Sequence, residues 1–523
     1  MILLDIIARR VFPSTRPIST DGPSGSKATH PLDIFNVLDV PVHRVGSWDK
    51  RTSYVPCLQL LLIVWTDRVT IDILPDDVLL HIFLFDRSWH RRWHLNWNWH
   101  RLVHVCQRWR SVAFAYPNFL GLKLVCGPTT RVELTGIWPP VPIIIKDITI
   151  WRKPKHYDFD AAIVHPSRVC ELYLTGLSSF QLERLVSATQ EQFPALIHLV
   201  LGSRDGDLVS TLPDGFLGGS APRLQSLELD SISFPMLPKL LLSSTDLVRI
   251  TLWNIPYSGN ISPEEIVTGL AELTKLKYLT IRFGHPQSLL GRRPHPPTRT
   301  VLPALTRFQF RGASEYLEDL VARIDTPLLD YIWITFFHQP LFDIPQLAQF
   351  MKRTTRLEAP DEVHVNLDHY GALVKSLSST RTYDEKSVLR ILCRGESREL
   401  NEQLLSLEQV FTSFFPSTYR VKHLYTTSRF LISRRNIENL RWLGIFRPFT
   451  AVKNLYVCKE FTECVALSLQ PDGERVTDML PALQSLFFEG IQRSGPVREA
   501  IGQFVSARQF IGHPIAVSEW SKR

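Results

Sequence analysis

The chain has 523 residues, of which 44% are hydrophobic and 21% charged, as is typical of globular proteins. Its 59 Lys and Arg residues exceed its 51 Asp and Glu residues by only eight, so the concentrated basic charge of a nucleic-acid-binding protein is not expected. A chain of this length exceeds what one compact core supports, so we expect several domains or one elongated repeat protein.

The seven cysteines form no CxxC pair, which argues against a disulfide framework or a zinc ribbon. We therefore expect a reducing compartment, the cytoplasm or the nucleus. In the N-terminal MILLDIIARR the arginines follow the apolar run, unlike in a signal peptide. The apolar run at residues 57–65 is too short to cross a bilayer, so no membrane association is predicted.

Residues 1–68 are predicted to be a disordered N-terminal segment. Prolines interrupt this segment, and its run STDGPSGSKATH is polar and shows no periodicity. The GPSGSK within this run lacks the spacing of a phosphate-binding loop, which needs four residues between its glycines. We therefore expect regular structure to begin near residue 73.

A short helical module is predicted at residues 69–120. In LPDDVLLHIFLF, Pro75 suits the first helical turn, where its missing N–H is not needed, and Asp76 and Asp77 complement the helix dipole. The apolar stripe of this first helix consists of Val78, Leu79, Ile82 and Phe83. A loop rich in Trp, His and Arg is predicted at 86–98.

A second helix is predicted at about 99–115, where the sequence Tyr-Pro-Asn that follows stops it. Its apolar face would consist of Leu102, Val103, Cys106, Trp109 and Ala113. Together the two stripes predict a helical pair that is near the lower size limit for an independent core.

Two histidine pairs in this region, His90 with His94 and His100 with His104, have the i, i+4 spacing that can hold zinc. On one continuous helix the outer histidines would lie about 21 Å apart, too far to share an ion, and the Glu of HExxH is absent. We therefore predict no metal site. Cation–π pairs within the chain explain the mixture of Arg and Trp better than base stacking does.

No motif for covalent chemistry is present: the sequence lacks a GxSxG elbow, a complete phosphate-binding loop and a GxGxxG fingerprint after a strand. Cys106 and His104 are i, i+2 neighbours, which point to different faces of a helix. We therefore predict a non-catalytic protein without catalytic residues or cofactors.

After residue 160 one frame recurs: apolar, two residues, apolar, one residue, apolar. The third apolar position is occupied by Leu174, Leu201, Leu229, Leu252, Ile281, Phe310 and Ile334. These markers are 23 to 29 residues apart, the spacing of leucine-rich repeats, in which each unit contributes one strand and a returning segment. A generic α/β domain with leucine-rich strands remains an alternative, because most units lack the usual Asn or Cys after the strand.

We expect a leucine-rich-repeat solenoid at 161–515, preceded by a connecting segment and solenoid cap at 121–160 and followed by a tail at 516–523. The frame is blurred between 340 and 445 and returns at 452–457 and 483–488. Return helices are expected at 180–193, 315–324 and 400–415. Neighbouring units would stack, because one unit cannot bury its own apolar side.

Side chains beside the apolar positions of these strands would face a binding partner. The predicted substrate-binding residues are Tyr173, Glu228, Trp253, Arg282, Gln309 and Trp333.

The helical module resembles the F-box motif in three elements that occur in order: the Leu74-Pro75 helix start, the apolar stripe, and the Val-Cys-x-x-Trp run within 102–110. Residues 116–147 are similar to the segment after the F-box in leucine-rich-repeat proteins abundant in mushroom-forming fungi. The loop at 86–98 is more aromatic than is usual in that family. The fold class is accordingly α/β, a short all-helical F-box module followed by an irregular leucine-rich-repeat solenoid.

The resemblance implies a substrate-recognition subunit of a Skp-cullin-F-box ubiquitin ligase, which acts in ubiquitin-dependent protein degradation. The module would bind the Skp adaptor, and through it a cullin and a RING ligase, while the repeats bind an unknown protein substrate. The expected adaptor-binding residues are Leu74, Pro75, Val78, Leu79, Ile82, Phe83, Leu102, Val105, Cys106 and Trp109. Of these, Leu79, Ile82, Phe83 and Trp109 are expected to be the anchors.

Two alternatives remain open. The helical stripes can pack on the repeats instead of on a partner, as a cap of the solenoid would. The chain would then be a leucine-rich-repeat interaction scaffold or a nucleic-acid-binding protein without a role in ubiquitin ligation.

Overall fold

The computed structural model describes residues 74–89, 102–117, 119–127, 141–146, 163, 165–204, 211–256, 261–286, 298–337, 344–354, 356–357, 360–368, 371–377, 387–394, 400–413, 415, 418–428, 442–469, 479–490 and 495–521. The predicted disordered segment at 1–68 lies outside these residues, as does most of the Trp-rich and His-rich loop.

Two helices, α3 (Asp76–Trp89) and α5 (Gln107–Ala115), form the core of the predicted helical module. Phe83 of α3 and Trp109 of α5 place their ring centroids 5.0 Å apart, and each is 1% exposed. Arg108 donates to the Asp76 carboxylate at 2.8 Å, an exposed ion pair that contributes little to stability. The pair is therefore held mainly by its apolar stripe.

The second helix begins later than predicted. Cys106 has extended backbone angles, φ −155° and ψ 170°, and its Sγ accepts a hydrogen bond from the Trp109 backbone N–H at 3.4 Å. Cys106 is therefore an N-cap and not part of a helical face, so the expected continuous helix at 99–115 is wrong. The first helix is longer than predicted, because residues 86–89 continue α3 and do not belong to a loop.

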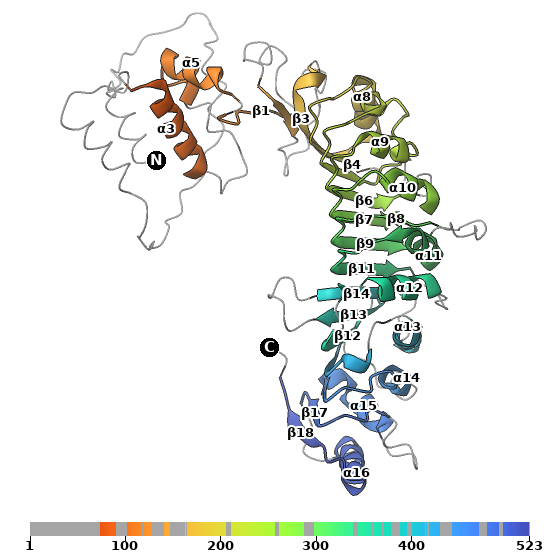
Figure 1. Cartoon of the computed structure of the whole chain (residues 1–523). Helices are drawn as coiled ribbons and strands as arrows, with labels where there is room; N and C mark the ends of the chain where they lie inside the picture. Colours follow the sequence, from red (N-terminus) through yellow and green to blue (C-terminus); the bar gives the residue numbers. More distant parts are fainter. Residues whose placement is uncertain are drawn as a thin grey trace, which may run out of the picture. The chain divides into compact units, whose positions relative to one another are not determined.

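A single sheet runs through the rest of the described chain, and Figure 1 shows its strands as a stack. The strands lie in the order β1-β2-β3-β4-β5-β6-β7-β9-β11-β14-β13-β12-β15-β16-β17-β18. Their bounds are β1 (Leu124–Cys126), β2 (Ile143–Lys146), β3 (Val169–Leu177), β4 (His198–Ser203), β5 (Ser226–Asp230), β6 (Arg249–Ile255), β7 (Tyr278–Phe283), β9 (Arg307–Gly312), β11 (Tyr331–Phe336), β12 (Glu362–Asp368), β13 (Gly371–Leu377), β14 (Ser387–Arg394), β15 (His423–Ser428), β16 (Asn454–Val457), β17 (Ser485–Phe488) and β18 (Ala516–Glu519). A separate pair consists of β8 (Thr300–Val301) and β10 (Ile324–Asp325).

The predicted repeat frame is confirmed by the strand register from β3 to β11. The parallel pairs place the seven marker residues side by side, one on each successive strand, from Leu174 to Ile334. Each marker exposes no more than 3% of its surface. The row is thus a continuous apolar core in which each strand is covered by its neighbours, as expected for a leucine-rich-repeat solenoid.

The blurred frame between 340 and 445 has a structural cause. Strands β12 and β13 pair antiparallel, as do β13 and β14, so the three strands form an antiparallel meander. The meander joins the parallel parts on both sides, because β14 pairs parallel with β11 and β12 pairs parallel with β15. The solenoid therefore continues through the irregular region with one reversed strand.

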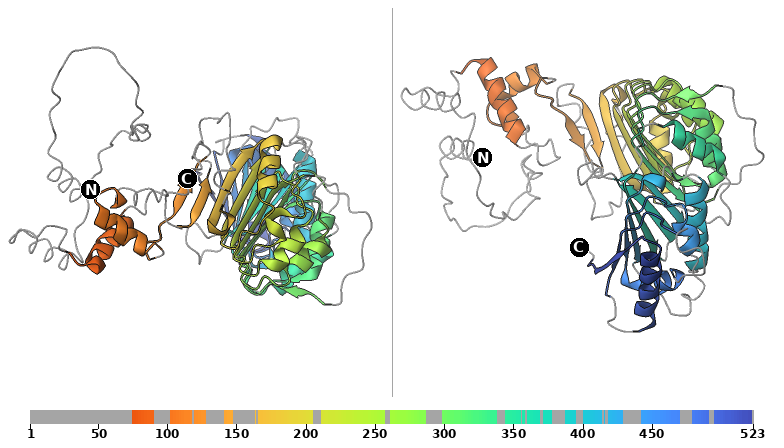
Figure 2. Two further views of the ribbon diagram at one scale, coloured as in Figure 1. Left: turned by 90° about the horizontal axis from the view of Figure 1, so that it is seen from above. Right: turned by 60° about the horizontal axis from the view of Figure 1, so that its bottom comes forward.

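Helices connect most of the parallel strands and lie on one side of the sheet (Figures 1 and 2). Their bounds are α8 (Ser179–Ala188), α9 (Leu237–Ser243), α10 (Pro263–Leu270), α11 (Ser314–Arg323), α12 (Pro345–Arg353), α13 (Leu400–Ser413), α14 (Trp442–Phe446), α15 (Thr462–Ser468) and α16 (Pro496–Phe510). Three of them, α8, α11 and α13, confirm the predicted return helices.

Local sequence explains where these helices begin. Ser178 and Gln181 form a capping box at α8, and Ser262 and Glu265 form one at α10. The α12 helix is capped from its neighbour: the Glu318 carboxylate on α11 accepts hydrogen bonds from the backbone N–H groups of the first turn of α12, at 2.8 and 2.7 Å. Adjacent repeats are thus joined by capping as well as by apolar contacts.

Both ends of the solenoid extend beyond the predicted limits of 161 and 515. The segment expected to be a connecting cap contributes β1 and β2, which pair with each other and with β3. The expected C-terminal tail contributes β18, which pairs parallel with β17. Within the described residues, no helix is both long and apolar enough to cross a membrane.

The residues two positions before the markers form a second buried row, and shortening one of these side chains should destabilise the solenoid. Leu279 of β7 is 1% exposed, so we expect Leu279→Ala to lower the free energy of unfolding by about 2–5 kcal/mol through lost burial and a residual cavity. Urea unfolding followed by circular dichroism measures this loss. The matched control is Leu242→Ala on α9, where the side chain is 47% exposed; equal losses in both variants would contradict the assigned register.

Candidate functional site

The described helices that connect the strands lie on one face of the sheet, and we call the opposite face the open face (Figure 2). Its side chains alternate along each strand with the buried residues of the core. The register aligns one position of every strand from β3 to β18 into what we call the middle row. This row consists of Tyr173, Val200, Glu228, Thr251, Thr280, Gln309, Trp333, Arg390, Lys375, His364, Tyr425, Tyr456, Phe487 and Ser518.

The six predicted substrate-binding residues all lie on the open face. Four of them belong to the middle row: Tyr173, Glu228, Gln309 and Trp333. Trp253 and Arg282 lie two positions further along their strands, on the same face. Trp253 is 37% exposed and the other five are half-buried. A contact between these residues and a partner stays a prediction.

Arginine and aromatic side chains alternate on the open face of β6, β7, β9, β11 and β14. Each arginine of this series lies over the ring that precedes or follows it, with guanidinium-to-centroid distances between 4.4 and 6.0 Å. The alternating order, which we call the arginine–aromatic cluster, is Arg249, Tyr278, Arg307, Tyr331, Arg390, Trp333, Arg282 and Trp253.

These five strands contain six arginines and no Asp or Glu. Acidic residues lie beyond these strands: Glu228 and Asp230 on the neighbouring β5, and on the other side Glu362 on β12, which is separated from β14 by β13 with its Lys375. Asp330 directly precedes β11. The open face therefore carries a local excess of positive charge that the small net charge of the whole chain conceals.

Sequence reasoning found three members of the cluster, Trp253, Arg282 and Trp333, but missed the other five. The missed members on β6, β7, β9 and β11 all lie three residues before a marker: Arg249, Tyr278, Arg307 and Tyr331. The same frame that located the middle row would have located this second row. The repeat frame could not locate Arg390, because this residue lies in the irregular region between 340 and 445.

The C-terminal part of the middle row is a stack of parallel rings. His364 and Tyr425 have ring centroids 4.3 Å apart, Tyr425 and Tyr456 4.1 Å, and Tyr456 and Phe487 4.5 Å, with interplanar angles below 10°. Trp520 meets Tyr425 and Tyr456 edge-on, and its indole N–H donates to the Val457 carbonyl at 3.1 Å. The rings cover one another's faces, so this stack stabilises the strands from β12 to β17.

Burial shifts the pKa of two tyrosines and one glutamate of the open face. It raises the pKa of Tyr173 to about 12, with the nearby Glu171 acting in the same direction. It also raises the pKa of Tyr331, although Arg390 and Arg307 oppose this shift. The pKa of Glu228 is raised by burial and by Asp230, while Arg249 lowers it. The positive charge of the cluster is therefore set by its arginines.

The helical module buries part of the expected adaptor-binding set. Leu79, Phe83, Leu102 and Trp109 are 6% exposed or less, so they form the core of the pair and do not offer free surface as docking anchors. Pro75 is exposed, Val105 is 37% exposed, and Leu74, Val78, Ile82 and Cys106 are half-buried. Two further apolar side chains that sequence reasoning did not select are more exposed: Tyr116 at 50% and Phe119 at 54%.

Other features of the described chain offer little for chemistry. No group of three or more His, Cys, Asp or Glu side chains in the described ranges could hold a metal ion, and three of the four histidines considered for zinc lie outside those ranges. Burial raises the pKa of the Cys126 and Cys170 thiols to about 11 and of Cys393 and Cys458 to about 12. These thiols stay protonated at neutral pH and are poor nucleophiles.

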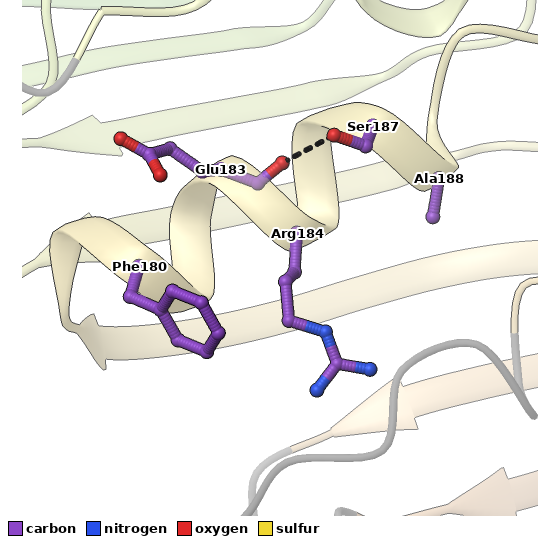
Figure 3. Close-up of a pocket in the computed structure, with 5 residues that line it drawn as sticks. All are labelled: Phe180, Glu183, Arg184, Ser187 and Ala188. Carbon is purple, nitrogen blue, oxygen red and sulfur yellow. Dashed lines mark hydrogen bonds between the residues drawn. The ribbon is translucent and has the colours of Figure 1, made fainter.

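A depression of about 500 Å³ lies beside α8 (Figure 3). It is lined by Phe180, Glu183, Arg184, Ser187 and Ala188. The Ser187 hydroxyl donates to the Glu183 carbonyl at 2.9 Å, so its hydrogen is used within the helix. All of the lining residues come from one helix, and we assign the depression no role.

Interrupting the stack of rings should loosen the C-terminal strands. Tyr456→Ala removes the stacked contacts with Tyr425 and Phe487 and the edge contact with Trp520, and we expect a loss of about 1–3 kcal/mol in the local free energy of opening. Hydrogen exchange of the β15, β16 and β17 amides measures this loss. Two controls should exchange nearly as wild type: Tyr456→Phe, which keeps the ring, and Tyr419→Ala, which removes a ring that is 60% exposed. Unchanged hydrogen exchange in Tyr456→Ala would contradict the role of the stack.

No protein-family model matches the sequence, and no curated protein is significantly similar to it. Among solved structures, the leucine-rich repeat-containing protein LegL7 from Legionella pneumophila is similar over 73% of this chain and 97% of its own, with 14% sequence identity and a TM-score of 0.24. A TM-score of this size carries no argument about function, which therefore rests on the residues of this chain.

Proposed function

We propose that this chain is the substrate-recognition subunit of a Skp-cullin-F-box ubiquitin ligase. In this proposal the helical module binds the Skp adaptor, and the open face of the solenoid binds a protein substrate. The chain itself performs no covalent chemistry, because the cullin and RING subunits bring the ubiquitin-conjugating activity to the bound substrate. It would act in the cytoplasm or the nucleus, where these ligases work.

The surface of the helical module is the observation that carries the proposal. Leu79, Phe83 and Trp109 are buried, and the rings of Phe83 and Trp109 contact each other. Apolar side chains nevertheless remain exposed around that core, notably Val105 and Phe119. So small a module gains from covering such side chains with a partner. The sequence resemblance to the F-box motif supports the Skp adaptor as that partner.

An interaction scaffold or nucleic-acid-binding protein is the second candidate. The arginine–aromatic cluster favours it, because single-stranded nucleic acids bind to basic surfaces that also present aromatic rings. In that case the helical module would have no adaptor to bind. Adaptor binding therefore separates the two candidates.

Ile82→Lys and Val105→Lys should each weaken adaptor binding. Both residues are apolar and partly exposed on the helical module, so a charge there would be desolvated in the interface while the core stays intact. We expect each variant to lower the affinity at least about tenfold. The measurement is co-expression of the full chain with a fungal Skp adaptor, followed by size exclusion and quantification of the co-eluting adaptor.

Two further variants make this experiment specific. Phe180→Lys on α8 replaces an apolar side chain that is 68% exposed on the solenoid, and it should leave adaptor binding unchanged. Leu79→Lys is not a clean test, because Leu79 is fully buried and a charge there should unfold the helical pair. If the wild-type chain forms no complex while circular dichroism shows it to be folded, the ubiquitin-ligase proposal is wrong.

A further inference from the structure

We propose that the arginine–aromatic cluster binds an extended acidic segment of a partner protein, in which the Asp or Glu carboxylates that face the sheet lie on the guanidinium groups of the cluster. This inference deepens the proposed function, since it takes the occupant of the open face to be a protein. It names the chemical class of the segment that is recognised.

Charge is the first argument for an acidic occupant. The register places Arg282 directly opposite Arg311, and Arg390 directly opposite Lys375. Like charges at directly opposed positions of a sheet repel each other. A negatively charged partner would relieve this repulsion, because it adds opposite charge where the sheet concentrates positive charge.

The geometry of the guanidinium groups is the second argument. Arg282 lies 4.4 Å from the Trp253 centroid and 5.8 Å from that of Trp333, so two rings hold it. Arg307 is held in the same way between Tyr278 at 5.8 Å and Tyr331 at 5.9 Å. The planar group carries several N–H donors that match a carboxylate in two parallel hydrogen bonds. Because the rings already restrict these side chains, less entropy is lost when they bind.

The size of the cluster sets the length of the segment. Neighbouring strands lie about 4.8 Å apart, so four intervals between five strands span about 19 Å. An extended peptide rises about 3.3 Å per residue, which corresponds to about six residues across the cluster. Glu228 and Asp230 on β5 would repel a longer acidic run at one border, and on the other side Glu362 of β12 would repel it beyond Lys375 of β13.

The covered rings favour a protein over a nucleic acid. Single-stranded nucleic acids gain affinity by stacking bases on ring faces. In the cluster, guanidinium groups lie over the rings of Trp253, Trp333 and both tyrosines. Further along the middle row, rings lie over one another. The open face therefore offers cationic groups more readily than free ring faces.

The test measures binding to the full chain without the adaptor, by fluorescence anisotropy. The probes are a labelled peptide with six consecutive Glu residues, the same peptide with Gln in place of Glu, and a single-stranded oligothymidylate of similar length. We expect the Glu peptide to bind, the Gln peptide to bind at least about tenfold more weakly, and the affinity of the Glu peptide to fall as salt is raised.

Arg282→Gln and Arg307→Gln should each weaken binding of the Glu peptide about tenfold. Arg→Lys at either position should weaken binding less, because the charge stays and only the planar group is lost. Arg307 is exposed, so its substitution leaves the core untouched even if Arg282→Gln impairs folding. Arg498→Gln, at an exposed position of α16 on the helix side, is the matched control and should bind as wild type.

Three results would overturn the proposal: equal affinity for the Glu and Gln peptides, unchanged affinity in the folded Arg282→Gln and Arg307→Gln variants, or arginine-dependent binding of the oligothymidylate without binding of the peptide. The last result would assign the cluster to nucleic acid. Because the adaptor is absent from this experiment, its outcome is independent of adaptor binding, and either proposal can fail alone.

Discussion

The in-register row of buried apolar residues is the constraint on which the solenoid depends. A strand with the apolar frame of these repeats cannot bury its leucines alone, so each strand needs a neighbour in the same register. The row from Leu174 to Ile334 satisfies this need strand by strand. Slipping one strand by one residue would move its leucines to the open face and its polar residues into the core. The core thus fixes which side chains face outward.

The open face inherits its regularity from that core. Side chains at one position of the repeat become neighbours about 4.8 Å apart, whether they are rings or arginines. Rings at successive positions stack, as between Tyr425 and Tyr456, and arginines beside rings lie over them, as Arg249 does over Tyr278 at 4.4 Å. Both arrangements hold long side chains in place without contributing to the apolar core. A surface with such restricted side chains is suited to recognition, because binding orders it little further.

The dependence of the fold on buried side chains explains which of its features could be predicted from the sequence. Seven strands and their register followed from one repeated frame, because the frame reflects burial directly. The arginine–aromatic cluster did not follow, since its pairs join residues more than twenty positions apart and need the register itself. Strands β12 to β14 pair antiparallel, so this part of the chain does not follow the parallel period that sequence reasoning uses. The last strand, β18, is fully exposed and shows no apolar alternation, and its pairing with β17 alone makes it a strand.

The helical module shows a second limit of sequence motifs. Residues of the motif such as Phe83 and Trp109 are buried within the pair, so the stability of the pair alone explains why they are present. Cys106 likewise serves the backbone, because its sulfur caps α5. Among the exposed apolar side chains, Val105 belongs to the motif, whereas Phe119 lies after it. A motif can therefore be satisfied for reasons of stability alone, and in the proposed function the exposed side chains of the module, and not its buried ones, would contact the adaptor.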